Sequence, residues 1–201
     1  MRLKPLPLLV LACLTACGPG PERPAGTGAL GSHERLEEVR SRAAELLPGA
    51  RLYQILGMAS GGAFADGLCS SWIYSFHSPE SNSLLRVYLG RDGLIQTPYE
   101  PESLQVGETP PPWNADAFID SAAAAAVISG HNVEGFIEDN EIFGERYLLF
   151  GPAKAAEPRW EITLLARDDA GFAKLVFTVD ALDGELLDKT SAPFVLEKAE
   201  P

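Results

Sequence analysis

The first predicted helix is marked by apolar residues that recur every three or four positions. They are Leu36, Val39, Ala43, Leu46 and Leu47. This spacing puts all of them on one helical face. Ser32 stands before the run as a candidate N-cap, and Pro48 followed by Gly49 predicts its end. We therefore expect an amphipathic helix here, with its apolar face packed on a sheet.

A second helical pattern begins at Asn114 and ends at Gly130. Its apolar positions are Phe118, Ile119, Ala122, Ala123, Ala126 and Val127. The alanine-rich run 122–126 has high helix propensity, and its small side chains allow close packing. We therefore expect a second helix that lies close against a sheet.

Strand-like segments follow each predicted helix. After the first helix they are residues 52–56, 71–77, 84–89 and 94–96, and after the second 133–137, 146–150, 160–165, 173–179 and 185–187. These are short apolar or alternating runs bounded by turn residues. One helix followed by several short strands, twice over, predicts an α+β fold of two tandem units. In each unit we expect the helix to pack on one face of an antiparallel sheet.

Two local patterns occur in both predicted units. The strand-like run 72–76, led by a tryptophan, matches the run 160–164. Asp92-Gly93 and Asp183-Gly184, each between apolar runs, are strong hairpin-turn signals. The interval between the tryptophans and that between the turns differ by three residues, which one loop can absorb. We interpret the pattern as an internal duplication; the alternative is chance similarity between two hairpin regions.

The N-terminus has the pattern of a bacterial export signal. Arg2 and Lys4 precede an apolar stretch, residues 6–14, that is too short for a stable membrane-spanning anchor. Residues 14–17, Leu-Thr-Ala-Cys, resemble the lipobox of bacterial lipoproteins. The resemblance implies that residues 1–16 are removed and that Cys17 then carries lipid on its thiol and its amine. The alternative is an ordinary secretory signal with an incidental cysteine.

Lipid on Cys17 implies an address in the bacterial cell envelope, with the membrane as a partner. Each buried CH₂ group contributes about 0.8 kcal/mol, so more than one fatty chain makes a durable anchor. Gly18 stands where an aspartate favours inner-membrane retention in enterobacterial lipoproteins. We therefore expect the outer membrane in preference to the inner one. Residues 17–32, rich in Gly and Pro, are typical of a flexible tether.

A proline-rich segment, residues 98–113, divides the rest of the chain. It contains Pro98, Pro101 and the run 110–112, which cannot sustain a helix or a central strand. We interpret it as an extended spacer between a first unit, residues 33–97, and a second, residues 114–201. Its alternative role is as a ligand for a proline-recognising partner.

The second unit, about residues 115–188, resembles the PepSY domain. The similarity lies in the strand Trp160-Glu161-Ile162 and in the closing hairpin 179–185, Val-Asp-Ala-Leu-Asp-Gly-Glu, where Asp183 replaces the usual threonine. The first unit carries a weaker version at residues 90–93. The resemblance implies a helix followed by an antiparallel sheet and, for some members, inhibition or regulation of proteases. The family has no shared catalytic residues to carry over.

Charge and cysteine content narrow the choice of partners. The chain has 28 acidic and 16 basic residues and a net charge of −12, and the removed segment contains two of the cations. Such a surface repels nucleic acid and anionic lipid headgroups. Cys69 is the one cysteine left in the domain, so no internal disulfide can form in the mature protein.

Few residues suggest covalent chemistry. Cys69 would act as a nucleophile only beside His77 or His131, and the alternative is a small buried thiol. The glycine-rich run 57–62 lacks the ending of a phosphate loop, and Ser60 lacks the preceding glycine of a nucleophile elbow. We therefore predict no catalytic residue and no cofactor.

Metal and ligand sites have equally modest support. The acidic run 138–141, near His131 and Glu134, lacks the alternating spacing of a calcium loop, so we favour a solvated turn. Two tryptophans, Trp72 and Trp160, could line a groove, but their large apolar area at matched positions favours the core. Trp113, after three prolines, is a better candidate for exposure, or else it packs the spacer on the second helix.

Together these patterns favour a non-catalytic, lipid-anchored module of the cell envelope. We expect it to bind an envelope protein or peptide, or to inhibit or regulate a protease, with Cys17 as its lipid-attachment site. One alternative is a structural envelope lipoprotein. The other is a hydrolase that uses a thiol or a pair of carboxylates.

Overall fold

The computed structural model describes five segments, residues 29–59, 64–104, 117–151, 157–168 and 171–193. In the first half, the described elements are α2 (Leu36–Leu46), β1 (Arg51–Ala59), β2 (Ser71–Ser78), β3 (Ser83–Gly90), β4 (Ile95–Gln96) and β5 (Glu102–Ser103). In the second half they are α3 (Ser121–Ser129), α4 (Val133–Asp139), β6 (Glu141–Phe150), β7 (Arg159–Asp168), β8 (Gly171–Asp180) and β9 (Leu186–Pro193).

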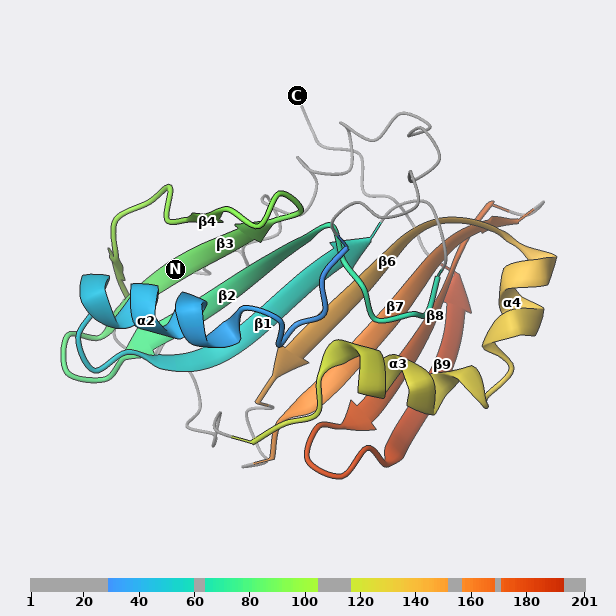
Figure 1. Ribbon diagram of the computed structural model, residues 1–201. Coiled ribbons are helices and arrows are strands. Elements are labelled where there is room, and N and C mark those ends of the chain that lie inside the picture. The colour runs from blue at the N-terminus through green and yellow to red at the C-terminus, as the bar shows by residue number, and fades with distance from the viewer. Residues whose placement is uncertain (1–28, 60–63, 105–116, 152–156, 169–170, 194–201) are drawn as a thin grey trace, which may run out of the picture.

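The strands of both halves form one antiparallel sheet (Figure 1). Its order is β4-β3-β2-β1-β6-β7-β8-β9, and β5 pairs with β3. The halves join where β1 pairs with β6, with Leu56 opposite Leu148. Each half therefore adds its strands outward from a shared centre, in chain order. The sequence does not show whether the two sheets join; the structure shows that they do.

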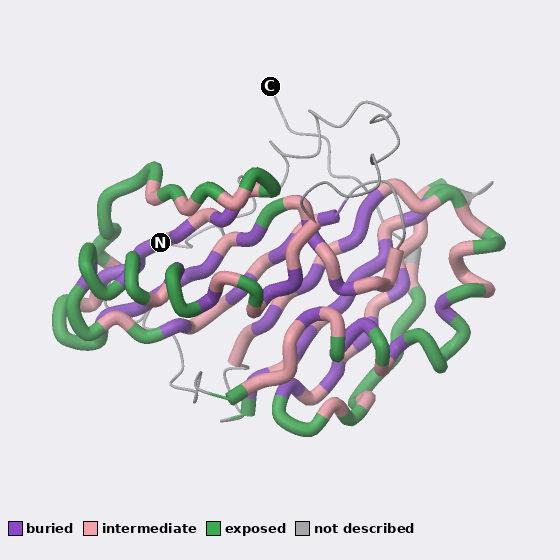
Figure 2. Tube along the Cα trace, in the orientation of Figure 1, coloured by how far each residue is buried: buried purple, intermediate pink, exposed green. Residues whose placement is uncertain are grey.

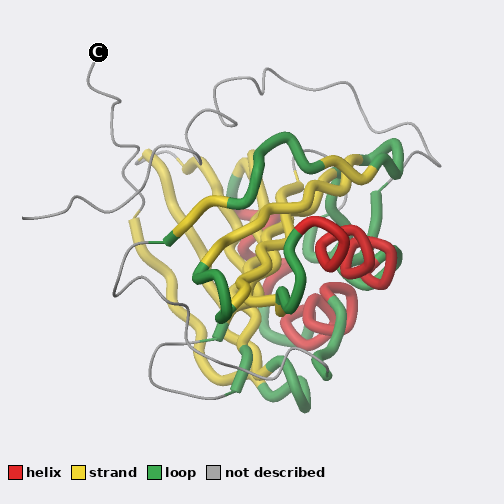
Figure 3. Tube along the Cα trace, turned by 90° about the vertical axis from the view of Figure 1, so that its left-hand side faces the viewer, coloured by secondary structure: helices red, strands yellow, loops and turns green. Residues whose placement is uncertain are grey.

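The helices lie on one face of this sheet (Figure 3). In Figure 1, α2 crosses the strands of the first half, whereas α3 lies over β7 and β8. This arrangement confirms the predicted α+β class, with helices packed on one face of an antiparallel sheet. No described helix is long and apolar enough to cross a membrane.

The core fills the space between helices and sheet. Side chains alternate between the two faces of a strand, so every second residue of the central strands is buried (Figure 2). The largest of these fully buried side chains include Trp72, Trp160, Tyr74, Tyr147, Phe76 and Phe177. Trp72 and Trp160 therefore lie in the core, as predicted, and line no groove.

Both helices begin later than their patterns predict. Ser32 does not cap α2, because residues 32–35 form a turn and the N-cap is Arg35. The second helix begins at Ser121, after an N-cap at Asp120 whose carboxylate accepts a hydrogen bond from the helix. Asn114, the predicted start, lies outside the described residues. The residues before each helix make contacts with the sheet that hold them out of helical geometry.

The prediction of a strand at residues 133–137 is wrong, because this segment begins helix α4. Val133, Phe136 and Ile137 have a helical spacing and pack against the core. A five-residue apolar run fits both periods, so its length could not decide between strand and helix. The predicted hairpin turns are correct: Gly93 and Gly184 adopt φ angles of +74° and +78°, which favour glycine.

Candidate functional site

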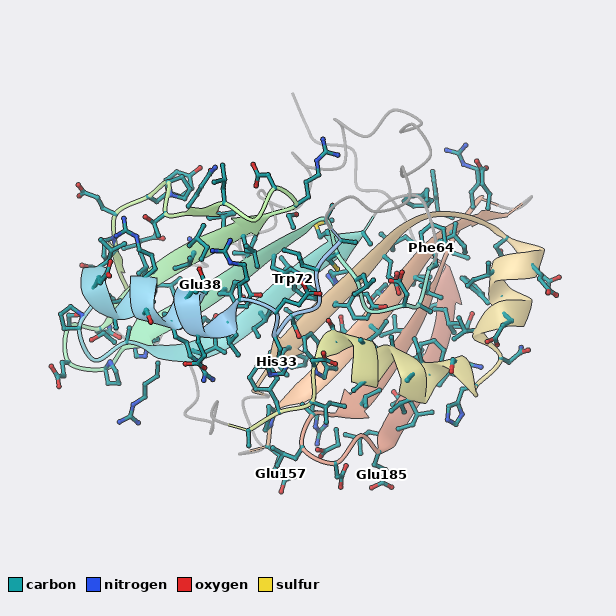
Figure 4. All side chains as sticks on the ribbon, in the orientation of Figure 1. His33, Glu38, Phe64, Trp72, Glu157 and Glu185 are labelled. Carbon is teal, nitrogen blue, oxygen red and sulfur yellow. The ribbon has the colours of Figure 1, made fainter. Side chains whose placement is uncertain are left out.

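Aromatic side chains fill the joint between the two halves. Trp72 and Trp160 meet edge to face, with ring centroids 6.4 Å apart, and Tyr147 lies within 6.5 Å of both. Phe118 stands against Trp160, and His33 stacks on Phe118 at 4.4 Å. Figure 4 shows Trp72 and His33 at this central position. Burial lowers the pKa of His33, an effect that outweighs the attraction of nearby Asp120.

Each tryptophan ties the segment before a helix to the sheet. The indole N–H of Trp72 donates to the carbonyl of Leu30 at 2.7 Å, and that of Trp160 donates to the carbonyl of Ile119 at 2.9 Å. Leu30 lies two residues before Ser32, and Ile119 lies two residues before Ser121. In both halves, an indole N–H thus fixes the segment before the helix to a strand of the sheet.

Ser32 and Ser121 form a reciprocal pair across the joint. The backbone N–H of each donates to the hydroxyl oxygen of the other, both at 3.0 Å. Ser121 also donates its hydroxyl proton to the carbonyl of Gly67 at 2.6 Å, and Tyr74 donates to the carbonyl of Ser32 at 2.8 Å. All these groups are buried, so the bonds satisfy polar atoms that would otherwise destabilise the core.

The loop 64–70 is held over the second half by a buried carboxylate and a phenol. Glu145 accepts hydrogen bonds from the N–H of Ala65 at 2.9 Å and from the hydroxyl of Tyr147 at 2.5 Å. The Tyr147 oxygen in turn accepts from the N–H of Gly67 at 2.9 Å. Burial and the adjacent Glu145 raise the pKa of Tyr147 far above its usual range. The tyrosine is therefore a fixed hydrogen-bond donor at any physiological pH.

The structure does not bring Cys69 together with a histidine. Cys69 is fully buried and pairs its backbone with Leu30 in an isolated bridge. His77 lies near the far end of β2, where its ring contacts Asn82 at 3.1 Å, and His131 follows α3. Cys69 and His77 are eight residues apart with most of β2 between them, a separation of roughly 20 Å. Cys69 and His77 are therefore too far apart to act as a nucleophile–base pair.

The acidic run 138–141 does not form a turn as predicted; it closes α4 and begins β6. Among the described residues, no group of three or more His, Cys, Asp or Glu could hold a metal ion. Three predicted features, Cys17, Ser60 and Trp113, lie outside the described residues. The depression between α2 and β4 is shallow and open, lined by Glu37, Glu38, Ser41, Arg42, Glu45 and Ile95.

The remaining candidate is the sheet face opposite the helices, which we call the open face. Residues that pair across strands share a face, so the register gives this surface row by row. The first row is Arg86, Ser75, Gln54, Phe150, Arg159 and Asp180. The second row is Tyr88, Ile73, Leu56, Leu148, Glu161 and Thr178. The third row is Ser71, Met58, Arg146, Thr163 and Val176.

An apolar band crosses the middle of the open face. Ile73, Leu56 and Leu148 are neighbours in the second row, with Met58 and Phe150 beside them, and all five are half-buried. No helix described in the structure covers them. An apolar strip of this kind, set among polar residues, is typical of a surface that binds another molecule.

Arginines surround the band, and their pairing differs. Arg146 forms an ion pair with Glu161 and contacts Thr163 at 3.4 Å. Arg86 forms an ion pair with Glu102 of β5 at 3.3 Å. These two arginines therefore already have carboxylate partners.

Arg159 forms no ion pair with a carboxylate in the described part of the chain. Its neighbour in the register, Asp180, instead accepts the backbone N–H of Leu182 at 2.8 Å. The Nε of Arg159 is buried and has no hydrogen-bond partner among the described residues. A buried donor left in this state costs about 1–3 kcal/mol, so an incoming acceptor would be stabilised there. The predicted strand, residues 160–165, begins one residue after Arg159, and the sequence pattern cannot show that this arginine lacks a partner.

Fold and surface together define an α+β protein with one continuous antiparallel sheet, whose described helices all cover the same face. No family model matches its sequence, and no curated protein matches it. Among solved structures, the chain is similar to one described as a "putative lipoprotein" from Clostridium difficile 630, with a TM-score of 0.49 and 8% identity over 78% of this chain and 92% of that chain. This similarity is too low to assign a family or a function. The resemblances to the lipobox and to the PepSY domain therefore stay predictions.

Proposed function

We propose that this protein is a lipid-anchored component of the bacterial cell envelope whose open face binds another envelope protein, without covalent chemistry. The observation that supports binding most directly is the open face itself, with its half-buried apolar band and with Arg159, which has no carboxylate partner among the described residues. The N-terminal sequence, with its lipobox-like residues 14–17, supports the anchor. Regulation of a protease is the specific form of binding that the PepSY resemblance suggests.

The anchor is tested by replacing its cysteine in the native host. The full chain should fractionate with membranes, and its mature N-terminal peptide should begin at Cys17 with the mass of attached fatty chains. Cys17→Ser should lose both the fatty chains and the membrane association. Native protein that begins elsewhere without acyl groups would overturn this part of the proposal.

Binding is tested by site-specific photo-crosslinking in living cells. A photoreactive residue at Leu148, on the open face, should crosslink to one discrete protein. The matched control places the same group at Leu46 of α2, which is 38% exposed on the helix side. Equal crosslinking from both positions, or none from Leu148, would contradict binding at the open face. The absence of crosslinks together with an envelope defect on deletion would favour the structural-lipoprotein alternative.

A further inference from the structure

The partner's chemistry can be inferred from what Arg159 lacks. In the three rows of the open face, Glu161 is engaged by Arg146, and Asp180 by the turn that follows β8. Arg159 is half-buried, with its Nε desolvated and no acceptor among the described residues. A guanidinium forms its strongest hydrogen bonds with a carboxylate, because the two groups match in charge and geometry. The open face therefore has one position, at Arg159, where a carboxylate of another molecule can bind.

An apolar position lies at a defined distance from that guanidinium. Leu148 is in the next strand and the next row from Arg159, so their backbones are separated by one strand spacing and two residues of rise. The diagonal is roughly 8 Å, since strands lie about 4.8 Å apart and each residue adds about 3.3 Å. In an extended peptide, side chains two residues apart share a face and lie about 7 Å apart. A segment with an acidic residue two positions from an aliphatic or aromatic one fits both positions.

The charge of the whole chain argues for a protein partner over a membrane surface. The rows of the open face contain more arginines than carboxylates, in a chain with a net charge of −12. On the helix side, α4 carries the exposed acidic residues Glu134, Glu138 and Asp139. An anionic bilayer would repel most of the molecule. A narrow acidic segment can reach Arg159 without approaching the acidic residues of α4.

We infer that the open face binds an extended acidic segment of a partner protein, with a carboxylate on Arg159 and an apolar side chain on the band at Leu148, Leu56 and Phe150. This inference rests on the proposed function, because it describes the partner of the same surface. Arg146 and Arg86 border the segment but are paired with Glu161 and Glu102, so Arg159 is the residue that selects the carboxylate.

The test uses the full lipidated chain in detergent and a phage-displayed library of random twelve-residue peptides. Enriched peptides should contain Asp or Glu two positions from Leu, Ile or Phe. Arg159→Glu should weaken binding of a synthetic enriched peptide at least tenfold, and Arg159→Gln should weaken it less. The matched control is Arg42→Glu on α2, where the same charge change should alter affinity less than twofold. Thermal unfolding of each variant verifies that it is folded.

Several outcomes would overturn the inference. Enriched peptides without carboxylates, no enrichment at all, or unchanged affinity in both Arg159 variants would each do so. Binding of the Cys17→Ser chain to vesicles of anionic phospholipid that depends on Arg159 would identify a membrane as the occupant. Self-association that Arg159→Glu abolishes would identify a second copy of the chain. A crosslink at Leu148 that persists in Arg159→Glu cells would leave the proposed function standing and remove only the acidic partner.

Discussion

On the face that the helices cover, the two halves of the sheet make matching contacts. Trp72 and Trp160 occupy matched positions, and each donates its indole N–H to the backbone just before a helix, at Leu30 and at Ile119. Ser32 and Ser121 pair with each other symmetrically at the joint. On this face, both halves meet the same requirement: a helix entry must be fixed to a strand without leaving buried polar groups unsatisfied.

On the open face the two halves differ. The residue before each matched tryptophan is Ser71 in the first half and Arg159 in the second, and the residue after it is Ile73 or Glu161. Packing against helices constrains the covered positions, whereas nothing in the described fold constrains their neighbours. The comparison teaches that folding requirements concentrate on one face, so the residues that distinguish the halves concentrate on the other.

The largest loss of stability is expected at Gly67, a residue of the first half that packs closely against the start of α3 in the second half. Gly67 has φ = +76°, and a Cβ there would lie 2.3 Å from the carbonyl oxygen of Ser121. Gly67→Ala should therefore lower the free energy of unfolding by on the order of 3 kcal/mol, measured by chemical denaturation. Gly130→Ala is the control, because a Cβ there meets nothing within 4 Å. Equal stability of the two variants would show that the loop does not press on α3.

The matched tryptophans allow the halves to be compared directly. Trp72→Phe and Trp160→Phe each remove a buried hydrogen bond and should lower the free energy of unfolding by about 1–3 kcal/mol. The carbonyl of Leu30 retains a bond from the N–H of Cys69, whereas that of Ile119 retains none among the described residues. Trp160→Phe should therefore be the more damaging variant. A greater loss for Trp72→Phe would reject this account.

Ser32 and Ser121 make symmetric hydrogen bonds to each other, but their replacement by alanine should lower the stability of the fold by different amounts. Ser121→Ala removes an acceptor for the N–H of Ser32 and a donor to the carbonyl of Gly67, whereas Ser32→Ala removes one acceptor. We expect losses of about 2 and about 1 kcal/mol, respectively. The double variant should lose less than the sum of the two, because both serines belong to one network. Strict additivity in denaturation experiments would mean that they act independently.

The smallest effect concerns pH and the stack of His33 on Phe118. Burial holds the pKa of His33 below its ordinary value of 6.5 in the folded state, so the unfolded chain binds the proton more readily. The contribution of His33 is fully present above pH 6.5 and is lost as the pH falls toward the folded-state pKa. His33→Phe keeps an aromatic ring but cannot titrate. Unfolding curves between pH 5 and 8 should show that the parent loses more stability on acidification than this variant.

Local features were predictable because they depend on near neighbours. The two Asp-Gly turns, the strands led by Trp72 and Trp160, and the burial of both indoles follow from period and residue type. Residues 133–137 were misassigned because a short apolar run does not determine its period. The starts of α2 and α3 were misplaced because contacts with distant strands, not the helical pattern, decide where each helix can begin.

The junction and the candidate site were not predictable from pattern. Pairing of β1 with β6 joins residues about 90 positions apart, and no periodicity encodes which edges meet. Within the described part of the chain, Arg159 has no carboxylate partner because its register neighbour Asp180 accepts a hydrogen bond from the loop that follows β8. The sequence shows that Arg159 and Asp180 are both present, and opposite charges of this kind would ordinarily be expected to pair. Only the three-dimensional arrangement reveals that they do not.

β1 acquires its second neighbour only when β6, which comes much later in the chain, is in place. Until then its nine residues form a bare edge, with N–H and C=O groups open to any strand that approaches. Because β1 and β6 occupy matching positions in the two halves, β1 of another partly folded chain can pair with this edge in place of β6. Correct assembly therefore depends on β6 pairing with β1 before another copy does, and a high concentration of partly folded chains would favour the incorrect pairing.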